Sequence, residues 1–480
     1  ANFYGDFASF LDFQEKFSKY KLASEERFNR LELGEEPELS LWKEMRKWSM
    51  EEFNKFYDLI NIHQDYLIGE SFYAKKGDKL ITEKLSTGEV VLFTDDLAER
   101  EVTSLKKRLE AGEITDVVFE KLSEEIARDV GAYVVLLPEG RRMVVKKASG
   151  ATIYATRDLA GIEHRVTTFN PDKMVYEVGE EQTGYFRDLF EAANALNLTE
   201  NKKVALVHAA HGFYIDADTG KKLSSREGVE GVISLIEKSI KYFRAKYEKR
   251  ERPDIALSAH GHGGEFAPIA TSGRSLDGKR DTEAEVSFVA NPPLLPRAGK
   301  GTATSVSRDN LTDEEKDRNS IKLAVGSIAF NDIKQEKRFS LSLYKDAERN
   351  IKIFEESGGA YIMYSLARAR SILRKVGDEA SGEKTKLLNS ELNEDEIRII
   401  KLVSDFPKII LRASIDDNPA TLAEFLLTLS NKYNGYYEKY RVLNSVGEIE
   451  HPHMLSIHKA VILVLEKGLK LCHADPPEII

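Results

Sequence analysis

The spacing of apolar residues in the first 70 positions predicts helices. Apolar side chains recur every three to four residues over 10–21 and again over 39–61, which is the spacing of one helix face. The second stretch carries a row of large apolar side chains that we expect to be buried in a core: Trp42, Met45, Trp48, Phe53 and Phe56. The chain is therefore predicted to begin with helical structure.

A different pattern follows, between about residues 70 and 140. Glycines and short alternating runs enter there, and they predict a small insertion that contains β-strands. Within it, residues 100–130 are strongly charged and have helical spacing. We expect this insertion to interrupt a larger α/β fold.

The most informative stretch runs from Ser149 to Gln182. Residues 152–156 alternate and are rich in β-formers, and the spacing from Arg157 to Arg165 is helical, so a strand is predicted to run into a helix. A further strand is predicted over 173–178, ending at Gly179. Ligands of α/β folds usually bind where such strands end.

Three side chains are expected at that edge of the sheet, namely Tyr154, Asp158 and Gln182. A carboxylate can take two N–H groups of a guanidinium, and a tyrosine can stack on the planar cation. These residues therefore predict a pocket for a small cation. In the structural alternative, Tyr154 belongs to the core, Asp158 caps the helix or pairs with a neighbouring cation, and Gln182 is solvated.

A second motif, KLSSREG, occupies residues 222–228, between Tyr214 and a helix expected from about Val229. Two cations and two hydroxyl groups on a loop suit a triphosphate, whose charge increases on the leaving pyrophosphate during nucleotidyl transfer. Its candidate phosphate ligands are Lys222, Ser224, Ser225 and Arg226. Such a loop can also be an ordinary exposed surface loop.

The last third of the chain has helical spacing throughout. From about Asp313 to the end we expect helices, among them residues 323–330 and 361–375. The preceding 250–310 are rich in Gly, Pro, Ser and Ala and predict an irregular segment, in which His260 and His262 alone are too few to indicate a metal site. The predicted domains are 1–245, an irregular 246–312, and 313–480.

Composition narrows the possible classes of protein. A chain of 480 residues allows about two to four domains. It has 70 basic and 80 acidic residues, so a nucleic acid would have to meet a local basic surface. Cys472 is the only cysteine, which excludes a disulfide framework and fits a reducing, cytoplasmic compartment. The sequence contains no apolar run of about 18 residues, so no membrane span is expected.

Together the motifs YATRDLA, DKMVYEVGEEQ and KLSSREG resemble the arginyl-tRNA synthetases, which are class I aminoacyl-tRNA synthetases. The resemblance is collinear and extends upstream to GESFY and downstream to YIMYSLARARSILRK and FLLTLSNKYNGYYEKYRVL. It implies an α/β fold with an incomplete Rossmann-like parallel sheet, interrupted by a connective insertion. An all-α anticodon-binding domain would follow.

The resemblance also implies an activity and its residues. Arginine would be activated with ATP and Mg²⁺ and passed to the 3′ end of tRNA(Arg) by a monomer. Arginine would be bound by Tyr154, Asp158 and Gln182, and the catalytic loop residues would be Lys222, Ser224, Ser225 and Arg226. Gly212, Phe213 and Tyr214 would lie near the adenine, with no metal held by protein side chains. The implied tRNA contacts are Tyr361, Tyr364, Arg368, Asn434, Tyr437 and Arg441, although packing could also explain the tyrosines.

Some positions depart from the family pattern. Its HxGH element, where two histidines stabilise ATP phosphates at a helix N-terminus, is expected before residue 1. Glu227 stands where the family has a second lysine, and Ser149 where it has an aspartate. Two alternatives therefore stay open. One is a tRNA-binding relative without catalysis, and the other is a synthetase for another amino acid, with lysine as the competing substrate.

Overall fold

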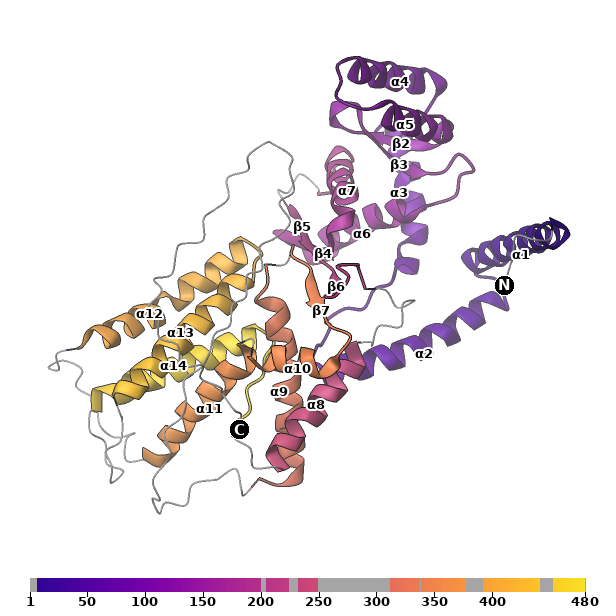
Figure 1. Ribbon diagram of the computed structural model, residues 1–480. Helices are drawn as coiled ribbons and strands as arrows, with labels where there is room; N and C mark the ends of the chain where they lie inside the picture. Colours follow the sequence, from indigo (N-terminus) through magenta and orange to yellow (C-terminus); the bar gives the residue numbers. More distant parts are fainter. Residues whose placement is uncertain are drawn as a thin grey trace. The chain divides into compact units, whose positions relative to one another are not determined.

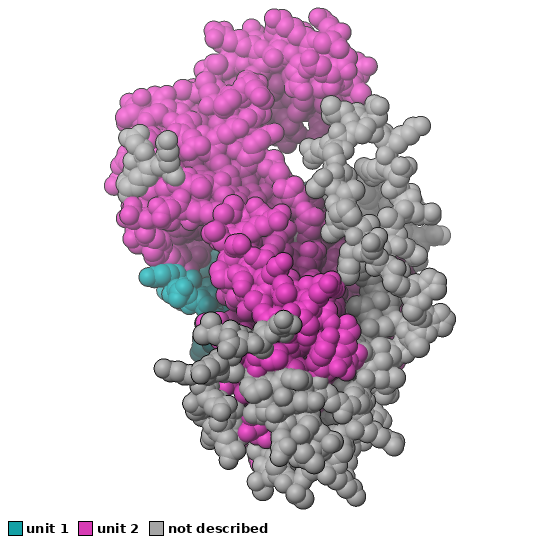
Figure 2. All heavy atoms as spheres, turned by 90° about the vertical axis from the view of Figure 1, so that its left-hand side faces the viewer, with its two compact units in different colours: residues 1–67 teal, residues 68–480 magenta. Residues whose placement is uncertain are grey.

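The structure is a computed structural model that divides the chain into two compact units, residues 1–67 and 68–480 (Figure 2). It describes residues 7–199, 204–223, 232–248, 311–336, 338–356, 358–376, 392–440 and 452–479. Several predictions lie outside the described residues: those for Ser224, Ser225, Arg226 and Arg441, and for the segment 250–310.

The first unit is a pair of helices, as predicted. Helix α1 (Phe7–Leu33) ends at Gly34, whose φ of 78° reverses the chain, and α2 (Glu38–Leu59) follows. The carboxylate of Glu38 binds Arg27 at 3.0 Å and Arg30 at 3.1 Å, and so joins the two helices.

The predicted burial of the α2 side chains is wrong for three of them within this unit. Met45, Trp48 and Phe53 are 54%, 55% and 52% exposed, and Trp42 and Phe56 are half-buried. A single partner helix covers only one stripe of α2, so an apolar row as wide as this one cannot be buried by it. Helical spacing correctly indicated the element but not its burial.

The predicted insertion contains both strands and helices. Its antiparallel sheet has the order β1 (Val91–Leu92), β2 (Tyr133–Leu136) and β3 (Arg142–Lys146). Between β1 and β2 lie α4 (Asp95–Glu110) and α5 (Asp116–Asp129), which confirm the predicted helical stretch. Both helices begin at a threonine, because the hydroxyl groups of Thr94 and Thr115 accept hydrogen bonds from N–H groups of the first turn.

The α/β part brings distant segments together around one core. It contains α3 (Ala74–Thr87), α6 (Tyr154–Phe169), β4 (Lys173–Gly179), α7 (Thr183–Ala195) and β5 (Ala205–His211). Strands β4 and β5 pair in parallel from Lys173↔Ala205 to Gly179↔His211, which confirms the predicted strand over 173–178. Leu159, Ile162 and Leu189 are fully buried between these elements.

The predicted strand over 152–156 is wrong, because helix α6 already begins at Tyr154. The hydroxyl of Thr156 accepts a hydrogen bond from the Ile153 N–H at 3.0 Å and donates one to the carbonyl of Val145. Thr156 therefore closes the first turn of the helix and ties it to β3. Tyr154 and Asp158 consequently lie on the first turns of a helix and not at the end of a strand.

A short strand inside the last third was also missed. Strand β7 (Leu341–Leu343) pairs in parallel with β6 (Tyr214–Asp216), so the stretch after Asp313 is not helical throughout. Three residues are too few to produce a visible alternation, and the partner lies more than a hundred residues earlier. The pairing attaches the segment before Lys222 to the last third of the chain.

The remaining helices form the C-terminal block (Figure 1). They are α8 (Val232–Glu248), α9 (Asp313–Ile333), α10 (Ala347–Glu356), α11 (Gly359–Val376), α12 (Glu394–Ile415), α13 (Ala420–Lys439) and α14 (Pro452–Leu471). Helices α9 and α11 contain the predicted 323–330 and 361–375. Helix α8 packs on this block although most of it falls in the predicted domain 1–245, because Phe243 and Tyr247 belong to the same core.

Cys472 lies in this core, where burial raises the pKa of its thiol to about 12.

The architecture is a parallel α/β part followed by a helical domain, as predicted. Among the residues that the structure describes, no helix is both long and apolar enough to cross a membrane.

Candidate functional site

The predicted cation-binding residues meet at the start of helix α6. Tyr154 and Asp158 are four residues apart and therefore share one face of the helix. The hydroxyl of Tyr185, from α7, donates a hydrogen bond to Asp158, and its ring centroid lies 5.3 Å from that of Tyr154. The ring of Tyr154 stays 58% exposed, so one of its faces is accessible to a ligand.

Asp158 is a half-buried carboxylate near Arg165 and Arg157. Burial raises its pKa, and the hydrogen bond from Tyr185 and the positive charge of each arginine oppose this only in part. In the part of the chain that the structure describes, no ion pair includes Asp158. A site of this kind favours a positively charged ligand, because the ligand could form the direct ion pair that neither arginine forms with Asp158.

A second carboxylate, Glu70, lies close enough to raise the pKa of Asp158 further. It belongs to the short turn Glu70–Phe72 and pairs with Arg157 at 3.0 Å. Gln182 ends the turn Glu180–Gln182 before α7 and is exposed. Tyr154 and Asp158 thus lie together, and Gln182 lies on the turn that leads to Tyr185.

Sequence reasoning did not single out Tyr185 and Glu70. Tyr185 could have been found, because it follows Gln182 by three residues and so falls on the first turn of the next helix. Glu70 lies in the GESFY motif, but its contact with Arg157 spans 87 residues. No local pattern reports a contact between residues so far apart.

The predicted adenine-binding residues form a turn fixed by backbone contacts. A side chain at Gly212 would place its Cβ 2.5 Å from the carbonyl of Phe339, so only glycine fits there. The Phe213 carbonyl accepts a hydrogen bond from the Leu341 N–H at 2.7 Å, and the Phe213 N–H donates to the Ser340 hydroxyl at 3.2 Å. The C-terminal block therefore holds this turn in place.

A pocket of about 440 Å³ opens at the same turn. Its walls include Phe213, Tyr214, Asp332 and Phe339. Desolvation raises the pKa of the Asp332 carboxyl group, and its hydrogen bond with Tyr214 opposes this in part. The pocket is large enough for a nucleoside.

Lys222 extends from a tight hairpin after β6. Its backbone forms a bridge with Ile215, and the Leu223 N–H donates to the Tyr214 carbonyl at 2.8 Å. The Lys222 ammonium lies 3.6 Å from the ring centroid of Phe213 and 3.7 Å from the Glu181 carboxylate. The structure therefore places Lys222 between the adenine turn and the end of β4.

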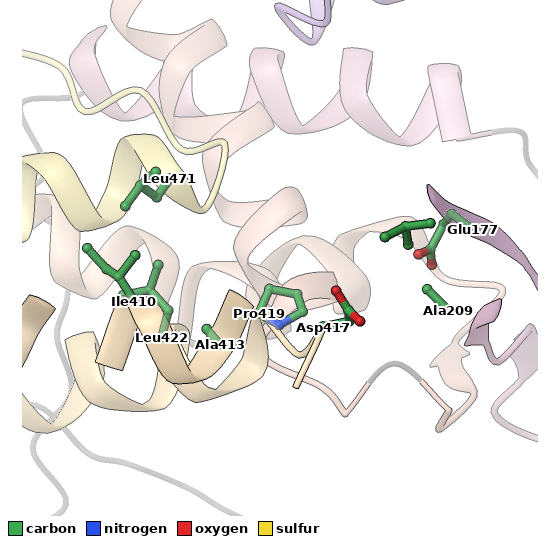
Figure 3. A pocket seen from close by; sticks show the side chains of 9 residues that line it. Glu177, Ala209, Ile410, Ala413, Asp417, Pro419, Leu422 and Leu471 are labelled. Carbon is green, nitrogen blue, oxygen red and sulfur yellow. The ribbon is translucent and has the colours of Figure 1, made fainter. Parts of the chain in front are cut away.

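A separate pocket of about 310 Å³ lies between the sheet and the C-terminal block (Figure 3). Glu177 and Ala209 line it from the strands, and Ile410, Ala413, Leu422 and Leu471 line it from helices α12, α13 and α14. Asp417 also lines the pocket, and both of its carboxylate oxygens bind Lys173, at 2.6 and 2.7 Å. The lining is mostly apolar and offers few groups that could orient a polar ligand.

Four of the predicted tRNA contacts meet on helices α11 and α13. The amide nitrogen of Asn434 donates to the Tyr361 hydroxyl at 2.7 Å and to the Ser365 hydroxyl at 2.8 Å. Its carbonyl oxygen is buried and has no partner in the described structure. Arg368 faces Tyr361 and Tyr437, and burial lowers the pKa of its guanidinium.

Tyr364 lies elsewhere, on the face of α11 that packs against α10. Its hydroxyl donates to Glu355 at 3.1 Å, and Glu355 also binds Lys246 of α8 at 2.6 Å. Burial raises the pKa of Tyr364 well above its usual value, and the nearby Glu355 carboxylate raises it further. The structure therefore gives Tyr364 a packing role and brings Tyr361, Arg368, Asn434 and Tyr437 together without it.

Two family models match the chain at the places where these sites lie. The model for the catalytic domain of class I tRNA synthetases (R) matches residues 103–257, and the model for the DALR anticodon binding domain matches residues 362–480. Arginine–tRNA ligases of Streptococcus thermophilus and Streptococcus pneumoniae are 28% identical to the chain over 457 and 456 residues.

The chain is therefore similar to arginyl-tRNA synthetases in both its α/β part and its helical part. Each of these relatives aligns with 94% of the chain, which spans 62% of the relative's own length. The fold agrees with two solved structures at 18% identity. The arginyl-tRNA synthetase of Plasmodium falciparum matches with a TM-score of 0.65 over 100% of this chain and 65% of that chain, and that of Thermus thermophilus with 0.60 over 98% and 69%.

The family matches include most of the site residues. Asp158, Gln182 and Lys222 fall inside the catalytic match, and Arg368 and Asn434 fall inside the anticodon-domain match. Among the described residues, no group of three or more His, Cys, Asp or Glu side chains is arranged to hold a metal ion.

Proposed function

We propose that the chain is the catalytic and anticodon-binding part of an arginine–tRNA ligase that acts as a monomer in the cytoplasm. It would use ATP to form arginyl-adenylate and pyrophosphate, and pass the arginyl group to the 3′ end of tRNA(Arg). The observation that carries the proposal is Asp158, a half-buried carboxylate with a raised pKa that is paired with a tyrosine hydroxyl and not with a cation.

Arginine fits this pocket through both its charge and its shape. Its guanidinium would bind the Asp158 carboxylate in a bidentate pair and lie against the exposed ring of Tyr154. Glu70 adds negative charge, and Gln182 is available on the neighbouring turn. A lysine ammonium would gain the charge contact but could not use the planar stacking surface in the same way. The pocket therefore favours arginine over lysine.

ATP would occupy the turn and the loop beside the pocket. Gly212, Phe213 and Tyr214 would lie against the adenine, and Lys222 with Ser224, Ser225 and Arg226 would stabilise the leaving pyrophosphate. Mg²⁺ taken up with the nucleotide would offset the negative charge of the triphosphate. The residues of this chain would orient the triphosphate so that its α-phosphate faces the carboxylate of arginine.

The C-terminal block would bind the anticodon. Tyr361 and Tyr437 present aromatic rings beside Arg368, and stacking of a base on such a ring contributes about 1–3 kcal/mol. The unpaired carbonyl oxygen of Asn434 lies behind them as an acceptor. Arg441 would add a further contact with the tRNA. Tyr364 would support it from behind through its bond to Glu355.

Arginine-dependent exchange between ATP and labelled pyrophosphate, in the presence of tRNA(Arg), tests the proposal directly. We expect exchange with arginine and none with lysine, and loss of exchange in Asp158→Asn but not in Asp172→Asn, which alters an exposed carboxylate just before β4. A chain that binds tRNA(Arg) without any exchange would instead be a binding protein. Equal exchange with lysine would contradict the arginine pocket.

A further inference from the structure

Glu181 lies between the two proposed substrate sites and has no role in either. It follows strand β4 and precedes Gln182 on the same short turn. Its carboxylate lies 3.7 Å from the Lys222 ammonium, which also rests 3.6 Å from the ring centroid of Phe213. The cation of the phosphate-binding loop thus touches one residue of the adenine turn and one at the end of β4.

Gly179 makes room for this arrangement. A Cβ atom at position 179 would lie 2.2 Å from a carboxylate oxygen of Glu181 and 2.9 Å from its Cδ. The missing side chain therefore allows the Glu181 carboxylate to fold back over the end of the strand. Because the obstructing atoms are the tip of a flexible side chain, an alanine at 179 would displace that carboxylate while the strand stays in place.

The backbone around Lys222 is fixed by hydrogen bonds, whereas its side chain can rotate. The Ile215–Lys222 bridge and the bond from the Leu223 N–H to the Tyr214 carbonyl fix the hairpin. Strand β6 is in turn paired with β7. A change of ligand for the Lys222 ammonium therefore needs only a rotation of its side chain.

We propose that Glu181 is a positioning residue that docks the Lys222 ammonium at the end of β4 and competes with the triphosphate for it. The inference rests on the proposed function of Lys222 in holding pyrophosphate. The side chains of Lys222 and Glu181 are 58% and 49% exposed, and an ion pair this exposed is weak and screened by salt. Several phosphate charges can therefore displace the carboxylate when the nucleotide binds.

Binding of inorganic pyrophosphate to the full chain, measured by calorimetry, tests the inference. Glu181→Gln should bind pyrophosphate about three- to five-fold more tightly than the unchanged chain, because the competing charge is gone. Gly179→Ala should change binding in the same direction. The control is Glu180→Gln, which removes an equal charge one residue earlier from a side chain that forms no ion pair with any described residue.

Two further readouts separate docking from a general effect on the fold. The KM for ATP should fall in Glu181→Gln with kcat nearly unchanged. The difference from the unchanged chain should disappear at about 0.5 M salt, where exposed charges are screened. Equal changes in Glu180→Gln and Glu181→Gln would reduce the effect to net charge and overturn the inference. Unchanged or weaker pyrophosphate binding in Glu181→Gln would also overturn it.

Lys222→Met distinguishes this inference from the proposed function. If Lys222→Met weakens pyrophosphate binding while Glu181→Gln leaves it unchanged, only the role of Glu181 is lost. If Lys222→Met has no effect, or if the unchanged chain binds no pyrophosphate, the proposed role of Lys222 fails together with the docking of its side chain.

Discussion

The amino-acid pocket and the cluster on helices α11 and α13 use the same residue types in opposite ways. In the pocket, the Tyr154 ring is exposed and Asp158 forms no direct ion pair with a described residue. In the cluster, the Tyr361 hydroxyl and the Asn434 amide are already bonded to each other, and Tyr433 behind them is fully buried. The pocket leaves room for a direct ion pair that a ligand can form with Asp158, whereas the cluster is held mainly by its own hydrogen bonds.

A substitution in the pocket should therefore have a larger effect on ligand binding than a substitution in the cluster. Asp158→Asn removes the charge and keeps the shape, and we expect arginine binding to weaken by about 2–5 kcal/mol, measured by calorimetry. Because burial raises the pKa of Asp158, arginine affinity in the unchanged chain should start to fall at a higher pH than for an ordinary aspartate. Asp158→Asn should lack this pH dependence. Arginine binding that survives the substitution would contradict the comparison.

The cluster should instead respond to pH through stability. His458 accepts a hydrogen bond from the Tyr433 hydroxyl and donates one to the Ala369 carbonyl, and burial lowers its pKa to about 4. The unfolded chain takes up the proton near pH 6.5 and the folded chain only near 4. Stability is therefore complete above about pH 6.5 and should fall by about 3 kcal/mol toward pH 4.

Urea unfolding at several pH values measures this loss of stability. His458→Gln should remove that part of the pH dependence, whereas His63→Gln, an exposed position outside the C-terminal block, should retain it. Identical pH profiles for the unchanged chain and both variants would show that the protonation of His458 does not limit the stability of the cluster.

Asn434→Ala sharpens the comparison further. It leaves the hydroxyl groups of Tyr361 and Ser365 without their donor, and we expect the free energy of unfolding to fall by about 1–3 kcal/mol. Asn431→Ala changes the same residue type at an exposed position of the same helix and should cost far less. Comparable losses in the two variants would mean that the hydrogen bonds of Asn434 do not hold the cluster together.

Much of the fold could be predicted, because long helices and the β4 strand carry their own spacing. The start of α6 could not, since β-forming residues over 152–156 are overridden by the Thr156 hydroxyl, which bonds to Val145 on another element. Strand β7 could not be predicted either, because its three residues show no pattern of their own and form a strand only by pairing with β6.

The site was predictable to the extent that its residues share a motif. Tyr154 and Asp158 lie in one motif and meet on one helix face. The contact between Glu70 and Arg157 joins two motifs, and that between Tyr185 and Asp158 joins two helices, so both depend on the folded structure. Helical spacing on α2 indicated a helix, but exposure depends on how many partners cover it.

The smallest expected effect concerns the hydrogen bond between Tyr185 and Asp158. Tyr185→Phe removes a donor that lowers the pKa of Asp158, so that pKa should rise. Arginine binding should change by about 1 kcal/mol or less at neutral pH and weaken more as the pH falls. Titration of arginine at several pH values measures this, with Tyr133→Phe in the insertion as the control. A parallel loss at every pH would point to packing instead.

The buried thiol of Cys472 gives the C-terminal block a reporter of its own. Alkylating reagents react with the thiolate, and here the sulfur is neither accessible nor ionised at neutral pH, since the residue is 1% exposed and its pKa is raised to about 12. The thiol is therefore alkylated only after the end of α14 opens. The chain has a single cysteine, so the rate at which Cys472 is modified would measure the rate of this local opening without an engineered probe.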